Sequence, residues 1–447
     1  MLRSTPFASL VDPRFGLIKS LEMTPLPPEM PRRLHRAHAM CSAAQRFSSW
    51  HSDKESGGFA WDDPAAAQAA AAGEAIERYC GNLVPAGLRR SSWKELDRAG
   101  EAAIDPLSLA LFSDAQYAER GFPFVPFDRD LPVLWTEGQS LVDGAPIWVP
   151  ASLVWVTFFF GAPTAGEPRT HATPYAGIAA GANREHAELS AMLELLERDA
   201  MSLAWHRGDP LPELDMPDWL IERVSTESVG LRFYEIPSEL GAPVVGALAH
   251  DATTDIQTLG MACRTEPVAA ALKAAAEAFQ LLLTGRILDN PASSYMEEVA
   301  AGAPGLGVKP WRADRAYRSS YRKDWRDAWD LLCHVQIHLD PVMRGPLMAR
   351  LSGGGTKRLD EMPVLGATRD GLVNHLQSHG YHPIRVDVTT PDVAETGLSV
   401  ARVVVPGLYG NAPAAFPYLG GERMARTDVA GAELHGAGPF RMPPPWG

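Results

Sequence analysis

The sequence predicts a mixed α/β (α+β) fold. Sheets with both parallel and antiparallel strands and long apolar helices are expected to form one intertwined unit. Helices are predicted near 64–79, 184–206 and 266–286, and strand-rich stretches fall between them and in the C-terminal third. Helices alternating with strands are typical of layered α/β architectures. The length of 447 residues favours about two or three folding units, and no internal repeat of fixed period is present.

The early part of the chain gives one clear helix. Residues 1–50 are expected to form an irregular N-terminal segment before a catalytic domain over 51–425. Pro64 follows Asp62 and Asp63, which are candidate capping residues, so a helix is expected from about Pro64 to Tyr79. The stretch 120–160 predicts strands and turns. Within and just beyond it, "PIWVPASLVWVTFFFGAP" predicts one or two buried strands, because β-branched and aromatic residues dominate it.

The remaining elements follow in order. A long helix is expected over about 184–206, and strands in "PVVGALAH" and "QTLGMACR". The helix "EPVAAALKAAAEAFQLLLTGR" begins at a proline, and a long excursion over 290–325 follows it. The C-terminal third predicts a helix near 369–379 and strands in "PIRVDVT" and "SVARVVVPG". Residues 426–447 are expected to be a Pro/Gly-rich tail that cannot be helical.

Composition and charge exclude several classes of protein. The net charge of −13 argues against a surface that binds nucleic acid or an anionic membrane, since phosphates would be repelled. The N-terminus lacks a signal-type apolar core, and the most apolar stretch falls short of the roughly 20 residues that a membrane helix needs. The four cysteines, Cys41, Cys80, Cys263 and Cys333, lie far apart and fit free thiols in a reducing cytoplasm.

Two acidic cassettes on otherwise apolar helices are the main chemical signal. Each has the pattern Glu-x-x-Glu-Arg, and residues three apart share a helix face, so each cassette presents a pair of carboxylates. Like charges among apolar neighbours need positive compensation. Carboxylate pairs suit Mg²⁺, which is usually shared with substrate phosphates. The pairs are Glu74 with Glu77, followed by Arg78, and Glu194 with Glu197, followed by Arg198.

These cassettes also permit an ordinary interpretation, in which each arginine pairs locally with its glutamates on a helix surface. Spacing alone does not decide between the two interpretations. The chain contains no Walker-type loop, and "SGGGTKR" has the wrong spacing and is expected to be a flexible loop. Zinc-protease, nucleophile-elbow, dinucleotide-binding and protein-kinase motifs are also missing from the sequence. Any nucleotide site would therefore need an unusual fold.

Three stretches together resemble one known family. "GEAIERY" resembles its first motif, "GIAAG" followed by "LELLERDA" its second, and "PIRVDVTTPDVAETGLSVARVVVPGL" its C-terminal signature. These are marks of the YcaO superfamily, and the resemblance covers about residues 50–420. It implies a YcaO-type nucleotide-binding fold that binds ATP without a Walker loop.

The resemblance also implies roles for individual residues. The four glutamates would hold Mg²⁺ ions on the triphosphate, and Arg78 and Arg198 match the motif arginines, which could contact phosphate or orient the glutamates. Further nucleotide-binding positions would be Lys273, Glu277 and Arg402. Members of the azoline-forming branch often end in a proline-rich tail that reaches the active site, which would give Pro445 a catalytic role. The chain departs from the family pattern at Ala70, Ala182 and His186.

The implied activity is ATP- and Mg²⁺-dependent cyclodehydration of Cys, Ser or Thr in a ribosomally made precursor peptide, giving thiazoline or oxazoline. The implied partners are the precursor peptide, a leader-peptide-binding protein, a flavin-dependent azoline dehydrogenase and a second copy in a homodimer. Two alternatives remain open: a YcaO enzyme that makes a thioamide or macroamidine, and a catalytically degenerate scaffold subunit of a peptide-modifying complex.

Overall fold

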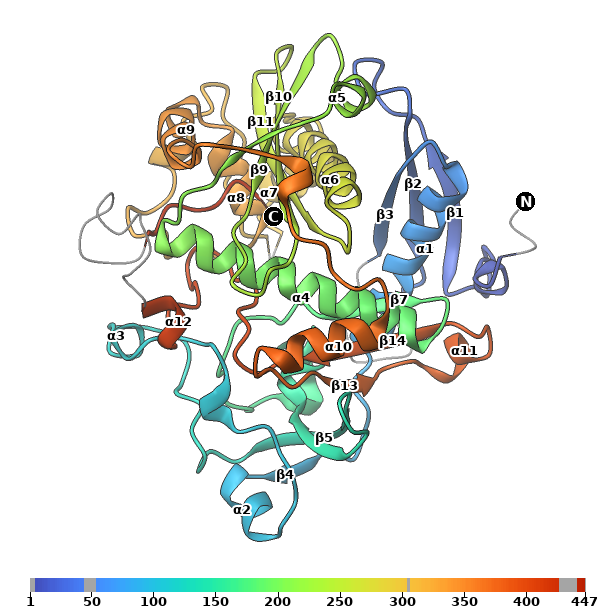
Figure 1. The fold of residues 1–447 in the computed structure, drawn as a ribbon, viewed down its shortest axis with the longest axis vertical. Helices are drawn as coiled ribbons and strands as arrows, with labels where there is room; N and C mark the ends of the chain where they lie inside the picture. The colour runs from blue at the N-terminus through green and yellow to red at the C-terminus, as the bar shows by residue number, and fades with distance from the viewer. Residues whose placement is uncertain (1–4, 44–53, 304–305, 426–439, 447) are drawn as a thin grey trace. The chain divides into compact units, whose positions relative to one another are not determined.

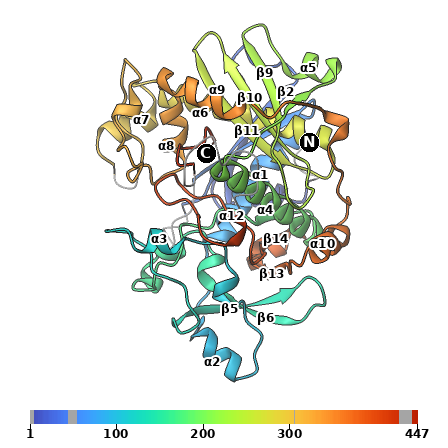
Figure 2. The same cartoon turned by 60° about the vertical axis from the view of Figure 1, so that its left-hand side comes forward.

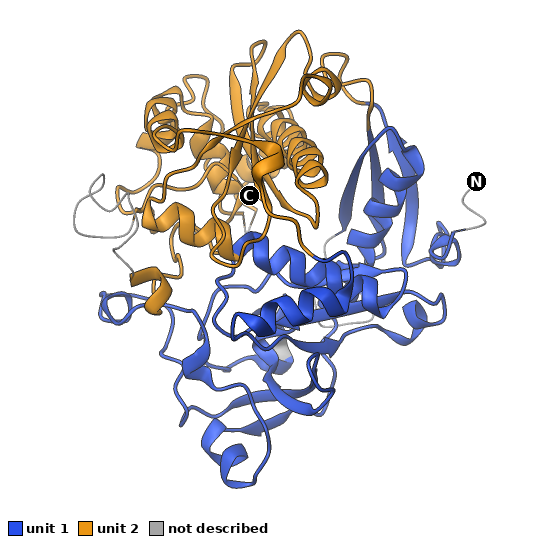
Figure 3. Ribbon diagram, in the orientation of Figure 1, with its two compact units in different colours: residues 1–25, 35–198, 366–410 blue, residues 26–34, 199–365, 411–447 orange. Residues whose placement is uncertain are grey.

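The computed structural model describes residues 5–43, 54–303, 306–425 and 440–446 (Figure 1). The chain divides into two compact units (Figure 3). Unit 1 comprises residues 1–25, 35–198 and 366–410, and unit 2 comprises residues 26–34, 199–365 and 411–447. Because each unit is assembled from segments distant in sequence, the chain is not a string of separate domains. The mixed α/β class predicted from the sequence is confirmed.

Unit 1 begins with a small sheet of order β1-β2-β3, formed by β1 (Ile18–Thr24), β2 (Leu34–Cys41) and β3 (Glu55–Trp61). Two of its strands lie inside residues 1–50, so the expectation of an irregular segment there was wrong. The alternation that defines β2 rests on small or weakly apolar residues, Ala37, Ala39 and Cys41, which bury their side chains on one face. Such residues give a weak periodic signal in the sequence.

A second sheet of unit 1 has the order β4-β5-β13-β14-β7, with β6 paired to β5. Its neighbouring strands run antiparallel. The strands are β4 (Arg89–Ser91), β5 (Val133–Ser140), β6 (Pro146–Pro150), β7 (Ile178–Gly181), β13 (Ile384–Asp387) and β14 (Ser399–Val404). The stretch after β6 forms 3-10 turns over 151–164 rather than a second buried strand. Strand β7 is one edge of this sheet.

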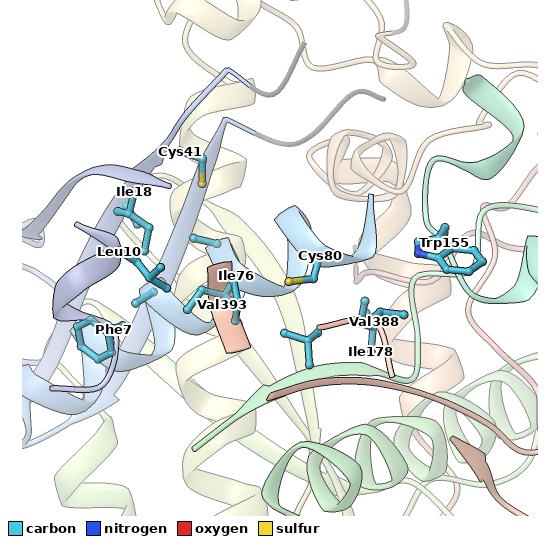
Figure 4. Packing of buried hydrophobic residues seen from close by; sticks show 14 of the residues in the cluster. Phe7, Leu10, Ile18, Cys41, Ile76, Cys80, Trp155, Ile178, Val388 and Val393 are labelled. Carbon is cyan, nitrogen blue, oxygen red and sulfur yellow. The ribbon is translucent and has the colours of Figure 1, made fainter. Parts of the chain in front are cut away.

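Helix α1 (Pro64–Gly81) packs against both sheets of unit 1, since it contacts β1 and β3 of the first and β7 and β14 of the second. Asp63 caps it by accepting hydrogen bonds from the amides of residues 65 and 66, as its sequence predicts. Figure 4 shows Ile76 and Cys80 of α1 among Ile178, Val388 and other core side chains. This burial on more than one side explains why α1 is built mainly from alanine.

The other helices of unit 1 are short, apart from the first part of α4. The division between the units falls within α4 (Arg184–Arg207), after Arg198. The short helices are α2 (Trp93–Arg98), α3 (Asp114–Tyr117), α10 (Arg369–Ser378) and α11 (Pro391–Ala394). The helices expected near 64–79, 184–206 and 369–379 are therefore confirmed.

Unit 2 is built on a sheet of order β11-β10-β9-β8-β12, in which β12 is parallel to β8 and the other neighbours are antiparallel. Its strands are β8 (Glu213–Asp215), β9 (Val229–Glu235), β10 (Val244–Asp251), β11 (Ile256–Cys263) and β12 (Thr356–Arg358). Strand β12 takes the end of "SGGGTKR", so the expectation of a flexible loop was wrong there. The segment pairs with β8, and Lys357 Nζ donates to Glu235 at 2.9 Å.

Helix α6 (Pro267–Leu288) packs against β10 and β11 (Figures 1 and 2). Among the described residues, it is the one helix long and apolar enough to cross a membrane. Its alanines Ala270, Ala271, Ala274 and Ala275 are fully buried against protein, so its apolar character is accounted for by the core of unit 2. The other helices of this unit are α5 (Asp218–Val224), α7 (Ser294–Ala300), α8 (Leu332–His338), α9 (Arg344–Leu351) and α12 (Glu422–Ala425).

The contact between α1 and β3 gives the first prediction. A Cβ atom on Gly58 would lie 2.1 Å from the Ala67 carbonyl oxygen and 2.3 Å from the Ala71 amide nitrogen. These are backbone atoms that cannot rotate away, so Gly58→Ala should destabilise the protein by about 2–3 kcal/mol. Chemical denaturation would measure this. Gly73→Ala, within α1 and with nothing within 4 Å of its added Cβ, is the control and should be neutral or stabilising. Equal stabilities would contradict the close packing of α1 on β3.

Candidate active site

The first cassette is held by the edges of two sheets. Glu74 Oε2 accepts a hydrogen bond of 3.0 Å from the amide of Gly57, on the edge strand β3. Glu77 Oε1 accepts one of 2.8 Å from the amide of Ala180, on the edge strand β7. Edge strands carry amides that lack a strand partner on their outer side. Here some of these amides bind carboxylates and thereby fix the glutamates of α1.

The second cassette is held in the same region of unit 1. Glu194 Oε2 accepts a hydrogen bond of 3.1 Å from the amide of Gly177, the residue before β7. Glu197 is buried, with a residue exposure of 6%. Arg198 lies between the two glutamates of its own cassette, with nitrogen–oxygen distances of 3.9 Å to Glu194 and 3.5 Å to Glu197.

These contacts bring together cassettes that are more than a hundred residues apart in sequence. Glu77 and Glu194 bind amides at Ala180 and Gly177, three residues apart on one stretch of chain. A fully extended chain covers roughly 10 Å in three residues, which bounds the separation of the two anchoring points. The carboxylates are also close enough for the charge of Glu194 to raise the pKa of Glu77. The two acidic helices therefore converge within unit 1, as the sequence predicted.

Gly177 is required at this point of convergence for two reasons. Its φ angle of +87° lies in the left-handed region, which favours glycine. An added Cβ would also lie 2.6 Å from the Val403 carbonyl oxygen on β14. Glycine therefore lets the chain enter β7 while its amide points to Glu194. The sequence marked the "GIAAG" stretch that begins here as a motif, but not the role of its backbone amides.

Three arginines partly balance the acidic cluster, and they do so differently. Arg78 lies 3.7 Å from Glu74 and stacks over the ring of Tyr175 at 5.7 Å. Arg198 pairs within its own cassette, as described above. Arg402, on β14, is 1% exposed and donates to the backbone carbonyls of Val154 at 2.9 Å, Pro174 at 2.8 Å and Ala176.

Arg402 was expected to bind the nucleotide, and its observed hydrogen bonds give it a second kind of role. Its guanidinium fastens the segment 174–176, which immediately precedes the Gly177 amide. Burial lowers the pKa of Arg402 to about 10, while the negative charges of Glu194 and Glu77 act against that decrease. Arg402 is therefore a buried cation within electrostatic reach of Glu194 and Glu77, and it also positions the segment that holds Glu194.

A buried histidine extends this network and was not found from the sequence. His171 is 1% exposed, and its ring lies 2.7 Å from the Ala172 carbonyl oxygen and 3.0 Å from Ser152 Oγ. A carbonyl only accepts, so Nδ1 carries the proton and Nε2 accepts from the serine hydroxyl. Burial lowers the pKa of His171 to about 4, so the ring is neutral. The sequence gives this histidine no motif, because its partners are a backbone carbonyl and a distant serine.

Burial and crowding give Glu77 an unusual acidity. The pKa of Glu77 is raised to about 8, mainly by burial. The charges of Glu194 and Glu74 also act to raise it, whereas the Ala180 hydrogen bond and Arg78 act to lower it. Near neutral pH this carboxyl therefore holds a proton for much of the time. A divalent cation would displace the proton, because it compensates the same crowding of negative charge.

The donor set fits Mg²⁺ shared with phosphates better than a cation held by protein alone. Among the described residues, no group of three or more His, Cys, Asp or Glu side chains is placed to hold a metal ion. Mg²⁺ commonly takes one or two carboxylates and completes its shell with water and phosphate oxygens. Glu74, Glu77 and Glu194 each bind an amide through one oxygen and have a second oxygen for such a role.

The other predicted positions have contacts of their own. Lys273 and Glu277 form an ion pair on α6 of unit 2. Pro445 is also in unit 2, where its carbonyl accepts a hydrogen bond from the Leu259 amide at 3.3 Å. His186, one of the departures from the family pattern, lies in the first turn of α4, where its ring is 3.4 Å from the Ala182 amide. The site roles of Lys273, Glu277 and Pro445 remain predictions.

Comparison with known proteins agrees with this fold. Residues 62–409 match the model of a family described as YcaO cyclodehydratase, ATP- and Mg²⁺-binding. The chain belongs to the YcaO family. An uncharacterized protein in the tfuA 3′ region of Rhizobium leguminosarum bv. trifolii is 26% identical over 240 residues, 50% of this chain and 53% of that protein. An uncharacterized protein of Methanothermobacter thermautotrophicus is 26% identical over 226 residues, 48% of this chain and 54% of that protein. The matches thus span about half the length of these curated relatives.

Solved structures share the fold. A heterocyclase in complex with substrate and cofactor has a TM-score of 0.60 at 21% identity, covering 91% of this chain and 52% of that one. The YcaO protein of Methanopyrus kandleri, bound with AMPPCP and Mg²⁺, has a TM-score of 0.54 at 19% identity, covering 89% and 90%. The microcin synthetase McbBCD complex of E. coli has a TM-score of 0.57 at 13% identity, covering 92% and 94%. At these identities the likeness establishes the fold alone.

The raised pKa of Glu77 predicts a pH-dependent stability in metal-free buffer. The folded-state pKa of about 8 lies above the ordinary 4.5, so the folded protein binds this proton more tightly than the unfolded chain. The resulting stabilisation is complete below about pH 4.5 and is lost as pH rises through about 8. Glu77→Gln replaces the carboxyl group with a neutral amide of nearly the same shape. The melting temperature of this variant should therefore be at least about 2 °C above that of the wild type near pH 9 and close to it near pH 5.

Thermal melts in EDTA across this pH range would measure the difference. Glu185→Gln is the matched control, because Glu185 is exposed on the first turn of α4. If Glu77→Gln and wild type show the same pH profile, the Glu77 carboxyl is not crowded as described.

Proposed function

We propose that the chain is an ATP- and Mg²⁺-dependent cyclodehydratase that converts Cys, Ser or Thr residues of a ribosomally made precursor peptide to thiazoline or oxazoline. The observation that carries this proposal is the convergence of the cassettes, since Glu77 and Glu194 bind amides three residues apart. Family membership supports the ATP and Mg²⁺ requirement, and the heterocyclase neighbour supports the reaction class.

The residues present fit a triphosphate with Mg²⁺. Glu74, Glu77, Glu194 and Glu197 would supply carboxylate oxygens to the cation, and Arg78 and Arg198 would neutralise phosphate oxygens or hold the glutamates in place. Arg78 lies close to both Glu74 and Tyr175 and so stands at the border of the cluster. Arg402 would contribute positive charge and fix the segment before Gly177.

The chemistry needs positioning and charge stabilisation more than a protein nucleophile. A substrate thiol or hydroxyl adds to the preceding amide carbonyl, and the former amide oxygen becomes an alkoxide. Bound ATP supplies the phosphoryl group that turns this oxygen into a leaving group. The addition closes the ring and releases the thiol or hydroxyl proton. Departure of phosphate and loss of the amide N–H proton then form the C=N bond, so that ADP and phosphate are released and the peptide has lost one water. The arginines, and the Mg²⁺ that the glutamates would hold, would stabilise negative charge during phosphoryl transfer.

The proposal extends to partners and location. The precursor peptide is the substrate, and a leader-peptide-binding protein, a flavin-dependent azoline dehydrogenase and a second copy of the chain are proposed partners in the cytoplasm. The E. coli neighbour is a microcin synthetase complex, which supports assembly with other subunits. The four cysteines are free and buried, which agrees with a reducing compartment.

The reaction gives a direct assay. Incubation of the protein with its precursor peptide, leader-binding partner, ATP and Mg²⁺ should lower the peptide mass by one water per ring, with stoichiometric release of phosphate. Mass spectrometry and phosphate detection would measure both. Exchange of oxygen for sulfur in the presence of a sulfide donor would instead identify a thioamide-forming enzyme. Unmodified peptide in a mixture that is otherwise active would contradict the cyclodehydratase proposal.

Substitution of the glutamates tests the site itself. Glu77→Gln and Glu194→Gln should each lower the rate of ATP hydrolysis by at least about a hundredfold, because each removes a negatively charged carboxylate that would bind the Mg²⁺ ion. Glu185→Gln, exposed on the same helix as Glu194, should retain wild-type turnover. Wild-type rates in both site variants would remove the metal assignment, and hydrolysis absent from the wild type itself would favour a scaffold subunit.

A further inference from the structure

In unit 2 the segment 440–446 is held mainly through its backbone carbonyl groups. Its sequence is Phe-Arg-Met-Pro-Pro-Pro-Trp, and its last four residues are buried. Four side chains and one amide donate to it: His206 Nδ1 to Phe440 O at 2.8 Å, Trp205 Nε1 to Met442 O at 2.8 Å, His338 Nε2 to Pro443 O at 2.9 Å, His334 Nδ1 to Trp446 O at 3.0 Å, and the Leu259 amide to Pro445 O at 3.3 Å.

These donors match the chemistry of a proline run. Pro443, Pro444 and Pro445 have carbonyl groups but no N–H, so a strand-like partner could not satisfy them by the usual exchange of hydrogen bonds. A surface that presents donors to the carbonyls satisfies such a segment, and its His206 carbonyl accepts the amide of Phe440, which precedes the prolines, at 2.8 Å. Known proline-rich ligands are bound in the same manner, by hydrogen bonds to carbonyls and by aromatic side chains.

The histidines are fixed as neutral donors by their surroundings. His334 and His338 lie four residues apart on one face of α8 and are 0% and 6% exposed. His334 Nε2 accepts a hydrogen bond of 2.9 Å from the Ala414 amide, so its proton must be on Nδ1, which faces the Trp446 carbonyl. Burial lowers the pKa of His334 to about 3 and that of His338 to about 4.

Aromatic contacts anchor both ends of the segment on one side chain. The Trp205 ring, 1% exposed, contacts the Trp446 ring edge to face at 4.8 Å between centroids and the Phe440 ring at 5.6 Å. Arg350 lies over the Trp205 ring at 5.1 Å. Such contacts each contribute about 0.5–1.5 kcal/mol beyond burial. Trp205 therefore binds the segment through its ring and through its N–H.

We infer that this surface of α4, α8 and β11 is a peptide-binding groove that reads the carbonyls of a proline-rich segment, and that residues 440–446 of the chain occupy it as a docked ligand. Docking here means that the segment can leave the groove while unit 2 stays folded. His206, His334, His338 and Trp205 are then positioning residues. The docking stands on the contacts above. Its consequence for catalysis, the placing of Pro445, rests on the proposed function.

A thiol reporter tests the docking in the full-length protein. Pro444 is buried in the groove, so Pro444→Cys introduces a thiol that is protected while the segment is docked. The native cysteines are buried, and Cys263 and Cys333 of unit 2 report global unfolding in the same sample. Alkylation followed by peptide mass spectrometry measures each thiol separately and does not depend on enzymatic activity.

A matched pair of substitutions isolates the hydrogen bond. In the reporter background, His338→Phe removes the donor to Pro443 and keeps an aromatic ring, whereas His338→Gln keeps an N–H near the position of Nε2. His338→Phe should accelerate alkylation of the reporter about tenfold while Cys263 and Cys333 stay protected, because it leaves a buried carbonyl without its partner. His338→Gln should remain close to the parent.

Two outcomes would overturn the inference. Equal, slow alkylation of the reporter in the parent, His338→Phe and His338→Gln proteins would show that the histidine donor does not hold the segment. A milder second variant, Trp205→Phe, removes the donor to Met442 and keeps a stacking ring. If Cys263 and Cys333 become reactive together with the reporter in both His338→Phe and Trp205→Phe, the segment is an inseparable part of the core and not a docked ligand.

Discussion

The architecture of the acidic site depends on hydrogen bonds between glutamate carboxylates and backbone amides at sheet edges. Glu74 is held by β3, Glu77 by β7, and Glu194 by the residue before β7. Without these donors, like charges on α1 and α4 would repel and turn towards solvent. An amide donor stabilises a carboxylate and adds no mobile counter-charge. The glutamates are thus fixed in place and still have oxygens available to a cation.

The packing of unit 1 serves this arrangement. Helix α1 lies against both sheets of the unit, so its alanines set a short distance to β3, and Gly58 allows that distance. Arg402 supplies a buried positive charge and at the same time binds the carbonyls of the segment that leads to Gly177. One side chain thereby couples the charge balance of the cluster to the position of its anchor. Loss of Arg402 would change both together.

Much of this was visible in the sequence, and the limits have physical causes. The long helices, the cassettes and the two strands β13 and β14 followed from periodicity and spacing, whereas the pairing of these strands did not. Strand β2 was missed because several of its buried positions are occupied by small residues, and β1 was missed because it buries only Ile18 and Leu21, three residues apart, without strict alternation. The roles of Gly57, Gly177 and Ala180 were invisible because they act through backbone amides, and a sequence pattern describes side chains. His171 and the histidines around residues 440–446 were likewise missed, since backbone carbonyl partners leave no motif, and the other partners are far away in the chain.

The central claim is that α1 and α4 supply oxygen ligands to the same nucleotide-bound cation site. Anomalous diffraction from crystals grown with Mn²⁺ and a non-hydrolysable ATP analogue tests it most directly. The account predicts manganese peaks next to the triphosphate, within coordination distance of carboxylate oxygens from both cassettes, with the amides of Gly177 and Ala180 still bound to Glu194 and Glu77. Manganese coordinated by one helix alone, or found away from both, would contradict it.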